Sequence, residues 1–202
     1  MTVRLYVEGG GDSKQLKTHC RRGFQKFIEK AGLHGRMPRI VACGGRQRAY
    51  DSFATALASG TSTPMLLVDS ELPVTDASEW EHLRKRDGWP RPGRAHENQC
   101  HLMVQAMESR FLADRATLKT FYGPGFHEES LPSNPRIERI AKADVLDGLA
   151  RATRQTNKGP YDKGPTSFDI LAEVDPSKVE KIGTARQAVS GRPACRELAV
   201  RG

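Results

Sequence analysis

The chain has 202 residues, 37% of them hydrophobic and 28% charged, which is enough for one well-packed domain with an appendage. It contains no apolar run of about 18 residues, and Met1–Leu5 lacks the features of a secretion signal, so we expect a cytoplasmic protein without a membrane partner. Lys and Arg outnumber Asp and Glu by 32 to 24, and the net charge of +8 favours nucleic acid or another polyanion as a partner. A basic protein with no such partner is the alternative that charge alone leaves open.

The first third of the chain alternates between short β-rich runs and amphipathic helices. We expect strands at Arg4–Glu8, Arg39–Cys43 and Met65–Asp69, separated by one helix that ends near Ala31 and another at Arg46–Ala58. Strands and helices that alternate at this spacing imply right-handed crossovers and a parallel sheet. The expected fold class is therefore α/β, a three-layer sandwich with a central, mostly parallel sheet and a C-terminal helical appendage.

The rest of the chain is less regular and richer in glycine and proline. The expected elements are helices at Asp76–Arg86, Glu97–Leu112, Ala116–Phe121 and Lys142–Thr153, a helix or turn at Ser167–Val174, and a last helix that starts at Asp175-Pro176. The segment Glu97–Leu112 is apolar over much of its surface, which predicts a buried helix. We expect a core at residues 1–122, a helical and irregular appendage at 123–182 packed on it, and a basic tail at 183–202 whose composition favours disorder.

The four cysteines form no C-x-x-C pair, so a zinc site of the common type is not expected. Cys20 and Cys43 fall on apolar positions and are expected to be reduced thiols of the core. His96, Cys100 and His101 are close in sequence, but no fourth ligand follows at a recognised spacing. A structural role is the favoured interpretation of that group.

Acidic residues end the first and third predicted strands. Glu8 precedes the glycine run Gly9–Gly11, and Asp69 is followed two residues later by Glu71. Because the carboxyl ends of parallel strands face the ligand crevice of an α/β sheet, the three carboxylates converge if the two strands are neighbours in a 2-1-3 order. Carboxylates at one spot repel each other unless a cation neutralises them, and their hard oxygen atoms suit Mg²⁺ or Mn²⁺. The alternatives are a tight turn after the first strand and a solvated loop after the third.

The same glycine run could also bind an anion. The amides of Gly10 and Gly11, together with the amino terminus of the next helix, could hold a phosphate. The pattern is neither a Walker A loop nor G-x-G-x-x-G. Asp12 or Ser13 is expected to cap the helix, and a simple capped turn is the alternative to a phosphate site.

Two further residues are candidates for the same site. Glu108 lies in the predicted apolar helix, where a buried acid is costly unless it is paired or binds a metal, so it either joins the metal shell or pairs with Arg110 or Arg115. Asp114 either caps the following helix or joins the acids. Lys163 could stabilise charge on a phosphate near a metal, whereas its spacing alone favours a solvated basic loop.

The acidic pattern resembles a known motif pair. Glu8-Gly9-x-x-Asp12 with Asp69-x-Glu71 is similar to the E-G-x-x-D and D-x-D pair of Toprim domains, found in topoisomerases, bacterial primases and overcoming-lysogenization-defect (OLD) nucleases. Longer stretches between about residues 3 and 180 resemble an uncharacterised bacterial family of Toprim-like proteins. These stretches are Val7–Asp12, Arg36–Gly45, Leu66–Glu71, His101–Asp114, Lys142–Leu146 and Lys163–Phe168.

The resemblance implies a Toprim-like, Rossmannoid core with added helices, and a metal-dependent nuclease that acts on DNA or RNA. Members of the family are often encoded beside an ABC/OLD-type ATPase, which implies an effector of ATPase-coupled antiphage defence and leaves a homo-oligomer open. The metal ligands would be Glu8, Asp69, Glu71 and Glu108, with the first three and Lys163 as catalytic residues. Glu71 replaces the second Asp of the motif, and the chain carries no ATPase of its own.

The alternative function is a non-catalytic sensor or regulatory subunit that docks on a partner ATPase. Topoisomerase or primase activity is not expected, because 202 residues leave no room for a strand-passage domain and no tyrosine nucleophile is marked by its local sequence.

Overall fold

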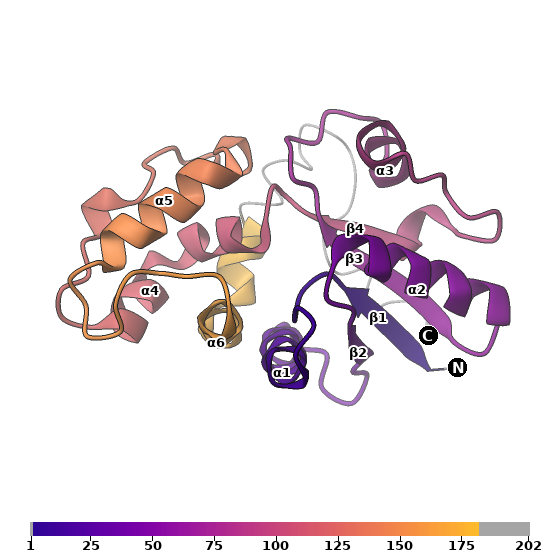
Figure 1. Ribbon diagram of the computed structural model, residues 1–202, viewed down its shortest axis with the longest axis horizontal. Coiled ribbons are helices and arrows are strands. Elements are labelled where there is room, and N and C mark those ends of the chain that lie inside the picture. The colour runs from indigo at the N-terminus through magenta and orange to yellow at the C-terminus, as the bar shows by residue number, and fades with distance from the viewer. Residues whose placement is uncertain (1, 182–202) are drawn as a thin grey trace.

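A computed structural model describes residues 2–181 (Figure 1), so the predicted basic tail at 183–202 lies outside the described residues. Within 2–181, no helix combines the length and the apolar character needed to cross a membrane. The principal elements are β1 (Val3–Val7), α1 (Lys14–Lys30), β2 (Arg39–Ala42), α2 (Arg46–Ser59), β3 (Thr63–Asp69), α3 (Glu79–Asp87), β4 (Cys100–Met103), α4 (Arg115–Tyr122), α5 (Lys142–Thr153) and α6 (Pro165–Glu173).

The four strands form one parallel sheet in the order β2-β1-β3-β4. This order confirms the predicted α/β class and makes β1 and β3 neighbours. In their register Val7 pairs with Leu67, so both strands end at the same edge of the sheet. Glu8, which follows β1, and Asp69, the last residue of β3, are thereby brought to one place.

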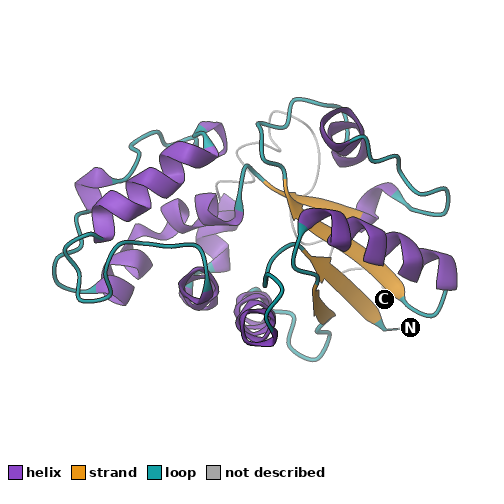
Figure 2. Ribbon diagram, viewed as in Figure 1, coloured by secondary structure: helices purple, strands orange, loops and turns teal. Residues whose placement is uncertain are grey.

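Helices cover both faces of the sheet, as Figure 2 shows. Leu5 and Val7 point into a hydrophobic cluster that includes α1, whereas Tyr6 between them points into a second cluster that contains Phe53 of α2 and Trp80 of α3. Successive side chains of a strand point to opposite faces, so β1 contributes side chains to both clusters. The three layers follow from this pattern.

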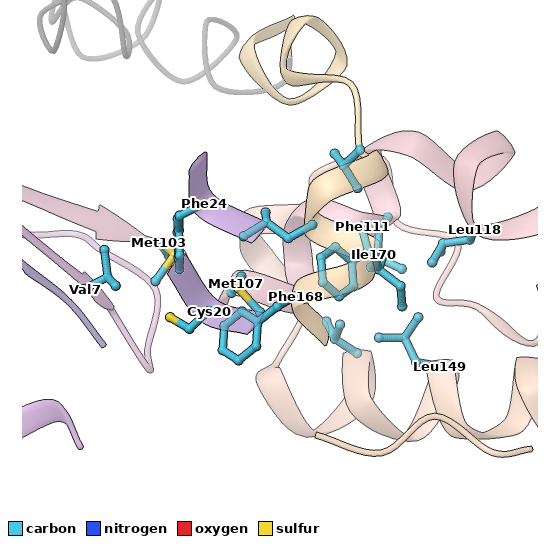
Figure 3. Close-up of a cluster of buried hydrophobic side chains, with 14 of the residues drawn as sticks. Val7, Cys20, Phe24, Met103, Met107, Phe111, Leu118, Leu149, Phe168 and Ile170 are labelled. Carbon is cyan, nitrogen blue, oxygen red and sulfur yellow. The ribbon is translucent and has the colours of Figure 1, made fainter. Parts of the chain in front are cut away.

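The first hydrophobic cluster continues from the sheet into α4, α5 and α6 (Figure 3). The aromatic ring of Phe168 packs beside Cys20 and over Gly9. Gly23 of α1 is required for this packing, because a Cβ atom there would lie 2.6 Å from the carbonyl oxygen of Phe168. The contact places the loop before α6, with Lys163, close to the carboxyl edge of the sheet. The boundary between residues 122 and 123 stays a prediction.

The predicted helix at Glu97–Leu112 is wrong. This segment contains a short 3-10 helix, then strand β4, and then a second 3-10 helix, η2, at Met107–Asp114. β4 pairs with residues 66–69 of β3 and satisfies backbone groups that would otherwise be buried without partners. A run that is apolar on all sides suits a buried strand as well as a buried helix, so periodicity could not separate the two.

The other predicted helices are confirmed, with small shifts at their ends. Ser13, one of the two expected caps, accepts a hydrogen bond from the Leu16 amide at 3.1 Å and begins α1. α6 starts at Pro165, and residues 176–181 are helical, as the Asp175-Pro176 pair predicts.

Candidate metal centre

Three carboxylates converge at the carboxyl edge of the sheet. One oxygen atom from each of Glu8, Asp69 and Glu71 can be chosen so that all three lie within 4.8 Å of one another. Asp69 is buried, with 5% of its surface exposed, and the other two acids are partly buried. Glu8 is 61 positions before Asp69 in the sequence, and the two residues meet because β1 and β3 are neighbours in the sheet.

The backbone fixes the direction of each acid. The Glu8 amide donates to the Leu67 carbonyl at 3.1 Å, so the β1–β3 ladder extends to Glu8. The Glu71 amide donates to the carbonyl of Gln105 at 2.8 Å, and Glu71 has a left-handed backbone conformation with φ 63°. Residues other than glycine adopt this conformation rarely, and such positions cluster at functional sites.

Hydrogen bonds connect the acids to each other and to the backbone. The amide of Asp69 donates to Oε2 of Glu8 at 3.1 Å. The amide of Met107, at the start of η2, donates to Oδ1 of Asp69 at 2.9 Å. Asp69 is therefore held by β3 on one side and by η2 on the other, and its Oδ2 atom faces the rest of the cluster.

Two cations that the sequence analysis did not single out lie against these acids. Nη1 of Arg46, at the first position of α2, lies 3.2 Å from Oε2 of Glu8, and the guanidinium also pairs with Asp87. Nζ of Lys142, the first residue of α5, lies 2.6 Å from Oε1 of Glu71 and 3.5 Å from Oδ2 of Asp69. Both cations stand at the amino terminus of a helix that faces the sheet edge, and that position is the one signal that could have indicated them.

The electrostatic balance of the cluster leaves excess negative charge. Burial, and then the charges of Glu8 and Glu108, raise the pKa of Asp69 to about 7, although Lys142 and Lys163 oppose the rise. Burial alone would lower the pKa of Lys142, but its hydrogen bond to Glu71 and the nearby carboxylates raise it overall. Burial is the largest cause of this rise, and the positive charges of Lys142 and Lys163 do not offset it.

Glu108 lies beside the cluster but outside the group of three. It is 1% exposed and sits in η2 rather than in an α-helix. Its Oε1 atom accepts a hydrogen bond from the Tyr161 hydroxyl at 3.0 Å and lies 3.5 Å from Nζ of Lys163. Its Oε2 atom is buried with no hydrogen-bond partner among residues 2–181. Arg115, an expected partner, donates instead to the carbonyl of Pro132.

The remaining candidates occupy structural positions. Asp114 caps α4, with its Oδ1 atom 3.3 Å from the Thr117 amide, and it forms an ion pair with Lys178 at 2.6 Å, so it does not join the acids. Within the described part of the chain, His96, Cys100 and His101 form no metal-binding group. The three described cysteines, Cys20, Cys43 and Cys100, are buried and unpaired.

The glycine run is tightly packed. Gly10 has φ +88°, and a Cβ atom there would lie 2.9 Å from the Cα atom of Lys17. Gly9 and Gly44 exchange two backbone hydrogen bonds of 2.8 Å, which join the turn after β1 to the turn after β2. Asp12 pairs with Arg48. A phosphate site at Gly10 and Gly11 stays a prediction.

A buried histidine positions the loop that carries two of the acids. Nε2 of His82 in α3 lies 2.9 Å from the carbonyl oxygen of Ser70, between Asp69 and Glu71. Its Nδ1 atom lies 3.2 Å from Oδ2 of Asp76. His82 therefore connects Asp76 to the backbone between Asp69 and Glu71, and hydrogen bonds of this kind behind the candidate ligands hold them in position.

The residues present fit a divalent cation. Their oxygen donors are those that Mg²⁺ and Mn²⁺ prefer. The unpartnered Oε2 of Glu108 and the raised pKa of Asp69 both indicate that the site lacks positive charge. Lys142 and Arg46 supply part of that charge, and Arg46 shares its own with Asp87.

The fold and the site define an α/β protein with a parallel sheet and an acidic cluster at its carboxyl edge. The model of one family, described as a domain of unknown function (DUF4276), matches residues 7–183, and the chain belongs to this family. No curated protein and no solved structure matches the chain.

Proposed function

We propose that the protein is a Toprim-like nuclease that hydrolyses phosphodiester bonds of DNA or RNA with Mg²⁺ or Mn²⁺. The observation that carries this proposal is the convergence of Glu8, Asp69 and Glu71, with oxygen atoms within 4.8 Å of one another. The shortage of positive charge around Asp69 supports it, because a divalent cation would supply that charge.

In this proposal each acid has a defined task. Glu8, Asp69 and Glu71 hold the cation, and Oε2 of Glu108 completes its shell from η2. The bound metal would supply a polarised water and positive charge at the scissile phosphate. The Met107 amide keeps Asp69 oriented, so that this carboxylate need not reorganise when the substrate arrives.

Lys163 is the candidate electrostatic catalyst. Its Nζ atom lies 3.5 Å from Glu108, and 46% of its side chain is exposed. It is therefore anchored beside the acids while its ammonium group can still reach a phosphate from solvent. A cation in this position stabilises the charge that develops on the phosphate oxygens during hydrolysis.

The biological setting is proposed from the resemblance alone. The protein would act in the cytoplasm as the effector of an antiphage system, coupled to a separate ABC/OLD-type ATPase, with a homo-oligomer as one form of the assembly. Co-purification of the chain with such an ATPase is the measurement that tests this setting.

A second function is favoured by a specific observation. Lys142 and Arg46 already pair with Glu71, Asp69 and Glu8, so the acids have partial charge compensation without a metal. The chain would then be a non-catalytic sensor or regulatory subunit of the ATPase. Titration with Mn²⁺ discriminates the two: a stable ATPase complex without measurable Mn²⁺ binding favours the regulatory subunit.

The nuclease is tested by cleavage of labelled DNA and RNA with Mg²⁺ or Mn²⁺, with and without the ATPase. Glu8→Ala and Asp69→Ala are expected to abolish cleavage, whereas Asp144→Ala, which removes an exposed acid of α5, is the control and should retain it. Cleavage that survives both site substitutions would refute the assignment.

A further inference from the structure

The surplus positive charge of the chain is concentrated on one helix. α1 carries six basic residues against one acid, Glu29, and therefore accounts for +5 of the net charge of +8. Its basic residues are Lys14, Lys17, Arg21, Arg22, Lys26 and Lys30. All six are exposed or partly exposed, on the sides of α1 that face away from the buried residues Cys20, Phe24 and Ile28.

Most of these cations lack acidic partners. Lys30 pairs with Glu173 at 3.6 Å, but the other five form no ion pair with any residue between 2 and 181. The cations at the acidic cluster differ, because Arg46, Lys142 and Lys163 are each bound to a carboxylate. Uncompensated like charges along one helix repel each other, so they are better explained by an anionic partner than by the stability of the fold.

The basic helix begins at the acidic cluster. Its cap, Ser13, follows Glu8 by five residues, and Lys17 packs directly against Gly10 in the turn between them. α1 has 17 residues and is therefore about 25 Å long, which is the length of about seven base pairs of a duplex. A backbone that contacts α1 along its length would reach the candidate metal ligands at its end.

The surface also indicates which form of nucleic acid fits. Proteins that hold single strands stack the bases on exposed aromatic side chains. Between residues 2 and 181 no Phe, Tyr or Trp side chain is fully exposed. On α1, Phe24 is buried against Phe168, and Phe27 is partly buried and packs against the first hydrophobic cluster. Contact through cations alone suits the phosphates of a duplex, whose bases are already stacked.

We propose that α1 binds the phosphate backbone of double-stranded nucleic acid, without base recognition, and directs it to the Glu8–Asp69–Glu71 cluster. This surface is the substrate-binding face of the proposed nuclease and rests on that function. The partner is a duplex rather than an acidic protein, because the row of cations leads to a site suited to phosphate chemistry.

The test is fluorescence anisotropy of a labelled DNA duplex of about 20 base pairs, and of a single strand of equal length, in EDTA so that no cleavage occurs. The variant is Lys14→Gln, Arg21→Gln and Arg22→Gln combined, which removes three exposed cations of α1. The matched control combines Lys119→Gln, Arg151→Gln and Arg154→Gln. It removes one exposed cation each from α4, from α5 and from the turn after α5.

We expect the α1 variant to bind the duplex at least about tenfold more weakly, and the slope of log affinity against log salt to fall by about 2 to 3, since each lost phosphate contact contributes about 0.9. The control should change affinity less than about threefold, and the wild type should prefer the duplex to the single strand. Equal losses in both variants, or tighter binding of the single strand, would overturn the proposal. If duplex binding depends on α1 but the protein never cleaves nucleic acid, the proposed nuclease function is wrong and the proposed interface stands.

Discussion

The buried carboxylate Asp69 should make the metal-free protein less stable as the pH rises. Its pKa is raised from 3.8 to about 7, chiefly by burial and then by Glu8 and Glu108. A pKa that is higher in the folded state gives a stabilising contribution that is complete below pH 3.8 and is lost as the pH rises towards 7. Asp69→Asn removes this titration and leaves an Oδ1 atom to accept from the Met107 amide.

The size of the effect follows from the shift. Each pKa unit corresponds to about 1.4 kcal/mol. The free energy of unfolding of Asp69→Asn, relative to that of the wild type, should therefore increase by about 2 kcal/mol between about pH 5 and pH 7. For a chain of this length that difference corresponds to a change in melting temperature of about 4–8 °C. The comparison between the two pH values cancels any constant effect of the substitution, such as a weaker contact with Lys142.

The assay is urea denaturation followed by circular dichroism, in EDTA, at several pH values. Asp144→Asn, the same substitution at an exposed acid of α5 outside the cluster, is the control, and the pH dependence of the difference in unfolding free energy should be larger for Asp69→Asn. If the free energies of unfolding of Asp69→Asn and the wild type differ by the same amount at every pH in this range, the electrostatic reasoning is wrong. Added Mn²⁺ should stabilise the wild type more than the variant.

Three further substitutions test other parts of the structure. Lys142→Gln removes the ammonium 2.6 Å from Glu71 and should raise Mn²⁺ affinity about tenfold in calorimetry. Unchanged or weaker binding would contradict the idea that the ammonium of Lys142 and the metal compete for the same carboxylates. His82→Ala leaves the Ser70 carbonyl without its partner and should weaken Mn²⁺ binding about tenfold or more, whereas the exposed His34→Ala should leave it unchanged. The last comparison is between Gly10→Ala and Gly32→Ala. The two glycines have nearly equal φ angles, +88° and +87°, but an added Cβ atom would contact Lys17 at Gly10 and nothing within 4 Å at Gly32. Gly10→Ala should therefore cost about 1–3 kcal/mol more in urea denaturation, and equal losses would show that the close contact is absent.

The convergence of the acids could be predicted because it depends on local patterns and one topological rule. The strand that precedes Glu8 and the strand that ends at Asp69 are recognisable from β-branched and aliphatic runs, and parallel strands that are neighbours end at the same edge. β4 could not be predicted, because its apolar residues suit a buried helix equally well, and its pairing with β3 decides the outcome.

Arg46 and Lys142, two of the cations beside the acids, were not predicted for a different reason. Lys142 lies 71 residues beyond Glu71, and its place at the start of a helix does not by itself show that it pairs with Asp69 and Glu71. It reaches them because α5 packs with η2, which itself holds Asp69 through the Met107 amide. The same tertiary packing explains why Glu108 pairs with Tyr161 and Lys163, whereas Arg115 donates to Pro132.

The central claim, that distant carboxylates together hold a divalent cation, is tested most directly by anomalous scattering from a crystal soaked in Mn²⁺. We predict a manganese peak within coordinating distance of oxygen atoms from Glu8, Asp69 and Glu71, with the ammonium of Lys142 displaced from Glu71. A crystal without a peak there, in which Lys142 keeps its contacts with both Glu71 and Asp69, would contradict the claim.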